Sequence, residues 1–590
     1  MRFDPYTETN QKRLTKALET SYRSMEWARN LTRNLVEAYA GSGYGRNKPR
    51  FETIINLMHQ TVEAYTMRLV ANRPRVMTST ARPDLLFFAK KYEIAINKMI
   101  EAIGLEFTLR RWTLDAYFGL GVVKVHLADS GLVQLEQDRW ADPGRPFASN
   151  VGLENYVVDM SATRKESRMF EGDSYRIPFS DIEGNEIYDQ EIVSGLKPSS
   201  RQSFEEDRLD MIARGELVDD DELEPMVDLC DLWFPRDGMI YTFPMASRGK
   251  FEITGKPVAA MEWSGTERGP YYELSFGDVP ENTLPTSMAA QNWPMHRIIN
   301  AAMRKEAKQL QRQKEILTYP PGSEKDAEKV QKADDGGVLQ VQSPELLNVM
   351  KMGGIDGPNH AKIMSDIQLY DRMAGNLTAM LGLGAQAPTA SQEEMIQSAV
   401  SNKEAQMQYR VQDATVRLIR ELAFLLWQDR AQTIPARMPV DGTDIDVDAT
   451  WTPDEREGSP FDYDVMIDVH AMGYTSPAQK WGKINSFLGQ TYAPLAPHFQ
   501  AAGAQLDLQA LTKLAAGLLN TPEVEQIVTF AAPLPMPPEE GGSAPVNGTT
   551  VHERRSVSAG PTPQNAMNME VDKFMGMRPE ETGGMRGNAI

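Results

Sequence analysis

The chain comprises 590 residues, 41% of them hydrophobic, and this length predicts roughly three or four packed modules rather than one core. Its formal net charge of −20 excludes tight, general DNA binding over most of the surface, since phosphate contacts require a basic face; a conduit that repels DNA and simple solubility both stay open. A single cysteine, Cys230, excludes a disulfide framework and a cysteine zinc cluster, and no uncharged apolar run of about 18 residues indicates a membrane span.

The N-terminal part of the chain predicts helices. Apolar residues at helical spacing indicate helices over residues 11–40, 51–73, 83–103 and 106–118. The glycine-rich stretch 41–45 has a superficial likeness to a phosphate-binding loop. However, it follows a helix and lacks a subsequent Gly-Lys-Ser/Thr, so we interpret it as a helix terminator.

Residues 120–280 alternate between apolar and polar side chains, which predicts a mainly β segment. The expected strands are Val122–Leu127, Val227–Phe234, Met239–Phe243, Val258–Trp263 and Tyr271–Phe276. Cys230 lies in one of these runs, so we expect a buried small hydrophobe rather than a reactive thiol. The acidic run 219–222 lacks the spacing of an EF-hand and indicates a solvated insertion.

The second half of the chain predicts long helices with short excursions between them. In chain order we expect a basic helix over 285–317, a strand at 337–342, a helix over 358–380, a Gly/Pro-rich loop at 382–388, a helix over 389–433, two strands around a turn at 445–451 and 463–470, and helices at 477–488 and 506–519. The helix that begins at 389 would span roughly 60 Å if straight, which exceeds an ordinary domain.

No catalytic motif is visible in the sequence. A P-loop, a His-Glu-x-x-His pair and a Gly-x-Ser-x-Gly elbow are all absent, and the seven histidines are scattered. The acidic pairs Asp444/Asp446 and Asp462/Asp464 each share one strand face and could hold a metal, but a solvated strand face is the favoured interpretation. We therefore expect no catalytic residue, no metal and no cofactor.

The order of elements resembles the portal (head–tail connector) protein family of tailed bacteriophages, in which two stem helices flank a small clip. Local segments similar to that family are Asn56–Pro74 (an early wing helix), Tyr271–Pro280 (the strand before the stem), Gly336–Val341 (a clip strand), and Leu381–Gly384 with Thr389–Glu394 (the tunnel loop and the helix after it). The resemblance covers roughly residues 10–530, and the insertion at 160–225 and the segment after 533 match nothing in it.

The resemblance implies an α+β subunit with a wing, a two-helix stem, a small α/β clip, a long spine helix and a helical crown. The implied modules are an N-terminal helical arm over 1–45, a wing over 46–284, a first stem helix over 285–318, a clip over 319–352, a second stem helix over 353–381, a tunnel loop over 382–390, a long wing helix over 391–434, a β segment of the wing over 435–475, a helical crown over 476–532 and a flexible C-terminal tail over 533–590.

In function, the resemblance implies a non-enzymatic ring, usually of twelve subunits, at one vertex of the capsid. Double-stranded DNA would pass through its channel during packaging and ejection. The implied partners are the terminase motor, adaptor and tail proteins, and the major capsid and scaffolding proteins. The implied location is the virion, after assembly in the host cytoplasm. The alternatives are another oligomeric virion structural protein and an unrecognised enzyme.

Three sets of candidate residues follow from this resemblance. The basic stripe is defined as Arg297, Arg304, Lys308 and Arg312, whose successive members lie one or two helical turns apart. It would either offer phosphate contacts to DNA in the channel or pair with Asp366 or Asp371 on a neighbour's stem. The tunnel-loop candidates are Leu383, Gly384, Ala385, Gln386 and Pro388, although an ordinary helix connection also explains them. The clip docking candidates are Lys325, Lys329 and Lys332, for which a solvated charged face is the alternative.

Overall fold

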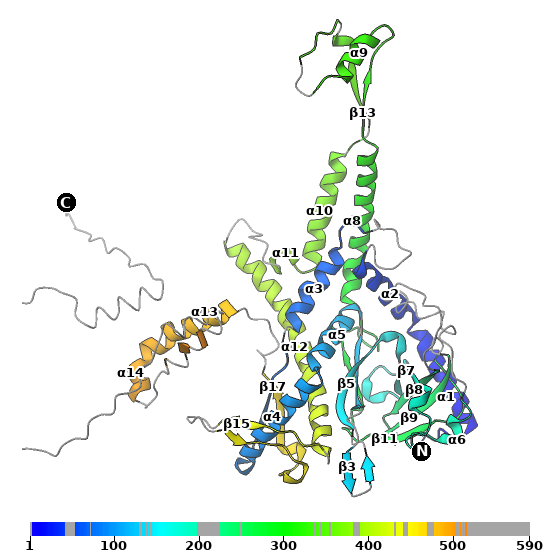
Figure 1. The fold of residues 1–590 in the computed structure, drawn as a ribbon, viewed down its shortest axis with the longest axis vertical. Coiled ribbons are helices and arrows are strands. Elements are labelled where there is room, and N and C mark those ends of the chain that lie inside the picture. The colour runs from blue at the N-terminus through cyan, green and yellow to red at the C-terminus, as the bar shows by residue number, and fades with distance from the viewer. Residues whose placement is uncertain are drawn as a thin grey trace, which may run out of the picture. The chain divides into compact units, whose positions relative to one another are not determined.

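The computed structural model describes residues 3–515 with gaps, the longest of which are 42–52, 197–224 and 381–389. The chain divides into two compact units, Met1–Ser476 and Pro477–Ile590. Helices and strands are mixed throughout the first unit, so the expected α+β class is confirmed (Figure 1). The tunnel-loop candidates and the glycine-rich stretch from residue 42 onward lie outside the described residues.

A group of helices forms the body of the first unit. These are α1 (Glu8–Ser24), α2 (Glu26–Ala40), α3 (Leu57–Leu69), α4 (Leu86–Ala102), α5 (Leu105–Phe118) and the short α6 (Gln190–Val193). The expected single helix over 11–40 is wrong, because α1 and α2 are separated at Met25. This side chain is fully buried against Val158 and Trp233, so tertiary packing rather than a glycine or proline marks the break.

The largest core cluster lies where α3, α4 and α5 pack against the long helix α12 (Ala390–Gln428). Aromatic rings fill its centre. The ring of Tyr92 stacks on that of Trp451 with centroids 5.1 Å apart, and Trp427 meets the same indole edge-on. The Tyr92 hydroxyl donates to the carbonyl of Ala423 at 2.6 Å, so the polar end of this buried ring is satisfied within the core.

Two antiparallel sheets form the β-rich part. One has the order β10–β9–β8–β7–β6, with β11 also paired to β9, and the other has the order β12–β2–β5. Their strands are β2 (Gly121–Ala128), β5 (Arg145–Val151), β6 (Tyr156–Val158), β7 (Glu171–Pro178), β8 (Met226–Phe234), β9 (Met239–Ser247), β10 (Glu252–Ile253), β11 (Ala259–Glu262) and β12 (Tyr271–Leu274), and a separate hairpin joins β3 (Val133–Glu136) to β4 (Arg139–Ala141). Cys230 on β8 is fully buried, as expected, and burial raises the pKa of its thiol.

The two strands expected around a turn at 445–470 form, but they do not pair with each other. The first, β16 (Asp446–Asp448), pairs with β15 (Arg437–Pro439), and the second, β17 (Tyr463–Ile467), pairs with β1 (Val76–Thr80). The β1–β17 pairing buries Val76, Val465 and Ile467 beneath α4 and α12, and this burial outweighs the advantage of a local hairpin.

A hairpin of two helices rises from the body and carries a small tip (Figure 1). Its elements are α8 (Met288–Gln311), β13 (Lys314–Thr318), α9 (Glu324–Gln331), β14 (Asn348–Met352), α10 (Gly357–Met373) and the one-turn α11 (Leu377–Met380). In the second unit the described elements are α13 (Pro477–Phe487), a π-helical turn (Leu488–Tyr492) and α14 (Ala493–Ala501), and most of the helix expected at 506–519 lies outside the described residues.

Two sequence expectations for this hairpin are wrong. The first stem helix ends at Gln311 rather than at 317, and the tip strand is β14 rather than residues 338–342. The cause is geometric. β13 directly follows α8 and β14 directly precedes α10, so these two strands continue the antiparallel helices and pair from Lys314 with Met352 to Thr318 with Asn348.

Candidate functional site

The foot of the two-helix stem is anchored to the body through α3. On α8 the buried Ile299 packs in one cluster with Tyr370 and Ala374 of α10 and with Leu57 of α3. The hydroxyls of Thr61 and Tyr370 lie 2.9 Å apart. These contacts fix the orientation of the lower end of the stem relative to α3.

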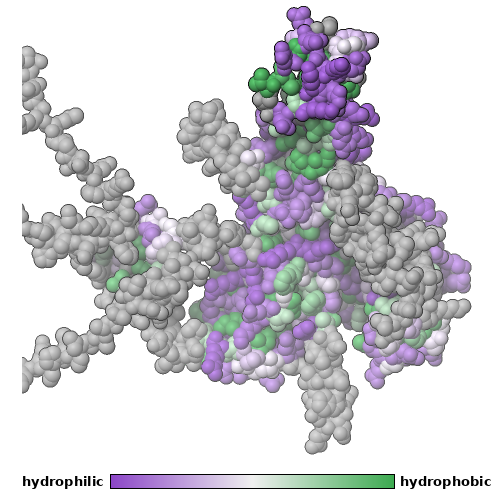
Figure 2. All heavy atoms as spheres, turned by 45° about the horizontal axis from the view of Figure 1, so that its top comes forward, coloured by the Kyte–Doolittle hydropathy of each residue, from purple (hydrophilic) through white to green (hydrophobic). Residues whose placement is uncertain are grey.

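The stem exposes large apolar side chains, some at its foot and some farther along the two helices. Those that are 43–53% exposed are Ile298 and Leu310 on α8 and Met364, Leu369 and Met373 on α10. Figure 2 shows apolar surface between the clip at the tip and the body. Between the two stem helices, His360 Nδ1 on α10 lies 3.0 Å from a carboxylate oxygen of Glu306 on α8. Large exposed apolar patches on proteins are commonly interaction surfaces.

The basic stripe lies on the face of α8 that is turned away from α10. Its members follow one another at intervals of seven, four and four residues, about half a helical turn around from Ile299. Arg297, Lys308 and Arg312 are exposed, and no ion pair to them is found among the described residues, whereas Arg304 is half-buried and in contact with other groups.

The two acids considered as partners for this stripe are engaged within their own helix hairpin. Asp366 is buried and accepts a hydrogen bond from the Lys362 ammonium. Asp371 accepts hydrogen bonds from the backbone N–H and the hydroxyl of Thr378, both at 2.8 Å. A neighbouring α10 would therefore present no free carboxylate to the stripe.

The clip at the tip is a two-stranded sheet with one short helix. Asp326 on α9 is buried and accepts the backbone N–H of Gln342 at 2.9 Å, which holds the helix to the segment before β14. All three candidate lysines lie on or directly after α9 and are exposed. Lys329 lies 3.7 Å from the buried Asp326, and Lys332 lies 2.5 Å from Glu328 in a pair whose two side chains are exposed and which is therefore weak.

The chain ends that flank the tunnel-loop candidates are clamped by α3. After α10, Gly375 and Asn376 adopt positive φ angles of 96° and 57°, which breaks the helix expected to run on to residue 380. The Tyr65 hydroxyl donates to the carbonyl of Ala374 at 2.8 Å. The guanidinium of Arg68 donates to the carbonyl of Met380.

The same guanidinium pairs with Glu404 on α12 at 2.9 Å. Arg68 thus joins the last described residue before the 381–389 segment to the helix after it. Sequence reasoning missed this clamp. The available signal was the spacing of Thr61, Tyr65 and Arg68, which places three hydrogen-bonding side chains on one face of the helix.

Two networks of buried charged side chains connect the two sheets of the wing. Lys124 on β2 lies 2.7 Å from Asp173 and 2.6 Å from Asp231, both on the other sheet. Although burial opposes it, these carboxylates raise the pKa of Lys124. The side chains are 9–13% exposed and each has an opposite charge within reach, so the cluster is a structural tie rather than a reactive site.

The second network centres on Arg168, which donates to both carboxylate oxygens of Glu273 at 2.8 and 3.2 Å. The hydroxyl of Tyr156 donates to Glu171 at 2.6 Å and to Glu273 at 3.0 Å. Burial raises the pKa of Glu171, whereas Arg168 and Lys165 hold that of Glu273 below its usual range despite burial.

The described residues offer no metal centre. No group of three or more His, Cys, Asp or Glu side chains among them could hold an ion. Asp464 pairs with Arg420 at 2.8 Å, and Asp462 accepts the backbone N–H of Ser459 at 2.8 Å, while Asp444 lies outside the described residues. In the same part of the chain, no helix is both long and apolar enough to cross a bilayer.

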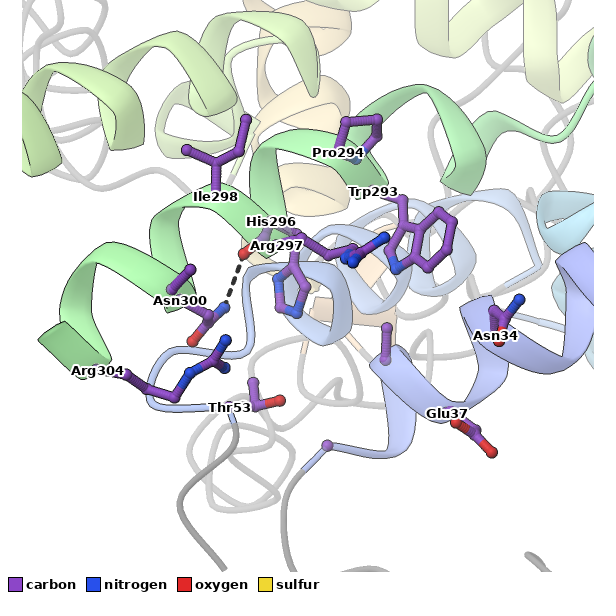
Figure 3. A pocket seen from close by; sticks show the side chains of 13 residues that line it. Asn34, Glu37, Thr53, Trp293, Pro294, His296, Arg297, Ile298, Asn300 and Arg304 are labelled. Carbon is purple, nitrogen blue, oxygen red and sulfur yellow. Dashed lines mark hydrogen bonds between the residues drawn. The ribbon is translucent and has the colours of Figure 1, made fainter. Parts of the chain in front are cut away.

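A cavity of about 580 Å³ opens between α2 and the foot of α8 (Figure 3). Its walls include Asn34 and Glu37 from α2 and Trp293, His296 and Arg297 from α8. The guanidinium carbon of Arg297 lies 5.1 Å from the centre of the Trp293 ring. The cavity is therefore mixed in character, with an aromatic wall, a basic edge and one acid.

Comparisons with known proteins give no family assignment. No protein-family model matches the chain, and no curated protein matches it significantly.

Proposed function

We propose that this chain is a subunit of a portal-like ring that conducts double-stranded DNA through a capsid vertex. The observation that carries the proposal is the hairpin of α8 and α10, which projects from a mixed body and ends in the β13–β14 clip. The order of elements, helix, strand, small helix, strand, helix, break and very long helix, is the order expected of wing, stem, clip, stem, tunnel loop and spine.

The stem surface supports an oligomer. Its five exposed apolar side chains are each about half buried in the single chain. Full burial of a large apolar side chain is worth roughly 1.5–3 kcal/mol, so covering the remaining halves would contribute about 4–8 kcal/mol per subunit. Lateral packing of stems around a ring is an arrangement that covers both helices of every copy.

The proposed ring has no catalytic role of its own. The terminase motor would dock on the clip during packaging, and adaptor and tail proteins would use the same end afterwards. The major capsid and scaffolding proteins would surround the wing, which places the ring in the virion. The acidic net charge of −20 per chain suits a conduit along which DNA slides without binding.

Negative-stain electron microscopy of the purified full chain tests the proposal. End-on views should show rings of about twelve subunits with an open axial hole. A compact closed particle of low symmetry would contradict the conduit. A second candidate, another oligomeric virion structural protein, shares the exposed apolar stem and predicts rings or layers that lack the axial hole.

A further inference from the structure

The cavity at the foot of α8 contains a buried polar group with an unused hydrogen-bonding atom. The His296 side chain is 3% exposed, and its Nδ1 has no hydrogen-bond partner among the described residues. In Figure 3 its ring points from α8 toward the cavity that it lines. Burial lowers the pKa of His296 to about 4, so the imidazole is neutral at physiological pH.

The neighbouring Asn300 has no such spare capacity. Its Oδ1 accepts the backbone N–H groups of Ile54 and Ile55 at 2.8 and 3.0 Å. Its Nδ2 donates to the carbonyls of Ile55 and His296 at 2.9 and 3.0 Å. Asn300 is therefore fully hydrogen-bonded, whereas Nδ1 of His296 in the same wall is a buried polar atom that the described residues leave without a partner.

The basic stripe starts at the edge of this cavity. Arg297 and Arg304 line the cavity, and the stripe continues along the same face to Arg312. At 1.5 Å per residue, Arg312 lies about 22 Å along the helix axis from Arg297. Lys305 is exposed beside it. The sequence of α8 contains a single acid, Glu306, and this side chain faces α10 through His360. Apart from Arg304, which is in contact with other groups, the stripe is therefore a row of exposed cations that no carboxylate of α8 neutralises.

We propose that the cavity and the basic stripe together form a docking face for an acidic polypeptide segment of a partner protein. An aromatic or aliphatic side chain of that segment enters the cavity, and its carboxylates lie along the stripe. Because Glu37 and the indole of Trp293 are part of the wall, the cavity suits a side chain better than a phosphodiester.

Other occupants fit less well. The chain's own segment 42–52, which adjoins the cavity in sequence, carries Arg46, Lys48 and Arg50 and so has the same sign of charge as the stripe. The stem of a second copy offers no free acid on α10, since Asp366 and Asp371 are engaged.

The position of this docking face rests on the proposed function. In a portal-like ring, α10 leads into residues 381–389 and hence toward the channel. The basic stripe faces away from α10, so it lies on the outer side of the stem. Proteins that surround the ring reach this side, whereas DNA in the channel does not.

Fluorescence anisotropy on the full chain at low salt tests the docking face. The probes are a fluorescein-labelled peptide of ten glutamates with one central tryptophan, the same peptide with alanine in place of tryptophan, and a labelled 12-base-pair duplex. We expect the tryptophan peptide to bind more tightly than both other probes. Replacing Ala301, an exposed residue of the cavity wall, by phenylalanine (Ala301→Phe) fills the cavity and should make the two peptides bind equally.

A charge-reversal triple, Arg297→Glu with Lys305→Glu and Lys308→Glu, should weaken peptide binding at least tenfold. A matched control is the triple Arg13→Glu, Lys16→Glu and Arg23→Glu, which changes the net charge equally on the exposed face of α1 and should bind like the wild type. Far-ultraviolet circular dichroism establishes that both variants fold.

Three results would overturn the proposal. One is equal binding of the peptide to the wild type and the stripe triple, or no binding to either. Another is tighter binding of the duplex that is lost in the same triple, which would make this a nucleic-acid surface. The third is loss of rings in the stripe triple but not in the control, which would make it a contact between copies. If the wild type forms no ring yet binds the peptide as expected, the proposed function fails while the docking face stands.

Discussion

Arg68 connects the carbonyl of Met380 to the carboxylate of Glu404, so loss of its guanidinium should loosen the connection between α11 and α12. The variant Arg68→Gln removes the hydrogen bond to the carbonyl of Met380 and the ion pair with Glu404. It leaves α3 itself intact, because Arg68 lies in the last turn of that helix and is 39% exposed. The connection between the end of α11 and the start of α12 should therefore loosen without loss of the fold.

The size of the effect follows from exposure. A hydrogen bond to a charged group contributes about 1.5–3 kcal/mol when buried, and the exposure of this guanidinium reduces the pair of contacts to about 1–2 kcal/mol. That difference corresponds to a roughly 5- to 30-fold larger population of the locally open state. Hydrogen–deuterium exchange read by mass spectrometry should show faster exchange in peptides that cover Leu377–Met380.

A matched control is Lys332→Gln, which removes a shorter but exposed ion pair on the clip, where both side chains are 62–74% exposed. This variant should leave exchange at Leu377–Met380 unchanged. If Arg68→Gln alters exchange there by less than about twofold, then the guanidinium does not clamp the two helices, and the reasoning from its contacts is wrong.

Three further changes test other parts of the chain. Lys124→Met leaves two buried carboxylates without a cation and should lower the free energy of unfolding by about 3–5 kcal/mol in urea titrations; a loss below about 1 kcal/mol would contradict the structural tie. Burial raises the pKa of Asp115 from 3.8 to about 6, so its ionisation costs stability increasingly between these two pH values and fully above them; Asp115→Asn should raise stability at pH 7 by about 1–2 kcal/mol, and thermal melts should show this gain fading as the pH falls from about 6 and vanishing below 3.8, where the wild-type carboxyl is protonated in both states. Leu369→Glu with Met373→Glu should prevent rings in electron micrographs while leaving the melting temperature of the single chain unchanged, and rings of normal size would argue against stem packing.

Elements with their own periodicity could be predicted from the sequence. The helix expected at 106–118 is α5, at Leu105–Phe118, and the strand expected at 227–234 is β8, at Met226–Phe234. In both cases the apolar residues whose spacing predicts the element are the residues that are buried in the structure. Local sequence is sufficient there because the buried face is decided within the element itself.

Features decided by distant partners could not be predicted in the same way. Arg68 reads as an ordinary surface residue of a helix, and its two partners lie 312 and 336 residues away in the chain. Likewise, Lys314–Thr318 continue a helical pattern in the sequence, and only pairing with Asn348–Met352 makes them a strand. Nor does the sequence indicate that Asp366 would pair with Lys362, or that Asp371 would accept hydrogen bonds from Thr378.

The wing and the stem differ in how far their charged and apolar side chains are buried, and this difference bears on how the chain would assemble. In the wing, Lys124 and Arg168 are buried and paired with carboxylates, and aromatic side chains such as Tyr92 and Trp112 are fully buried. In the stem, half-exposed leucine, isoleucine and methionine side chains are accompanied by exposed cations such as Arg297 and Lys308, to which no ion pair is found among the described residues. The wing is stabilised within one chain, whereas the stem is packed within the chain mainly at its foot and, in the proposed ring, would gain further stability from contacts with neighbouring copies. Changes in the wing should therefore alter folding first, and changes in the stem should alter assembly first.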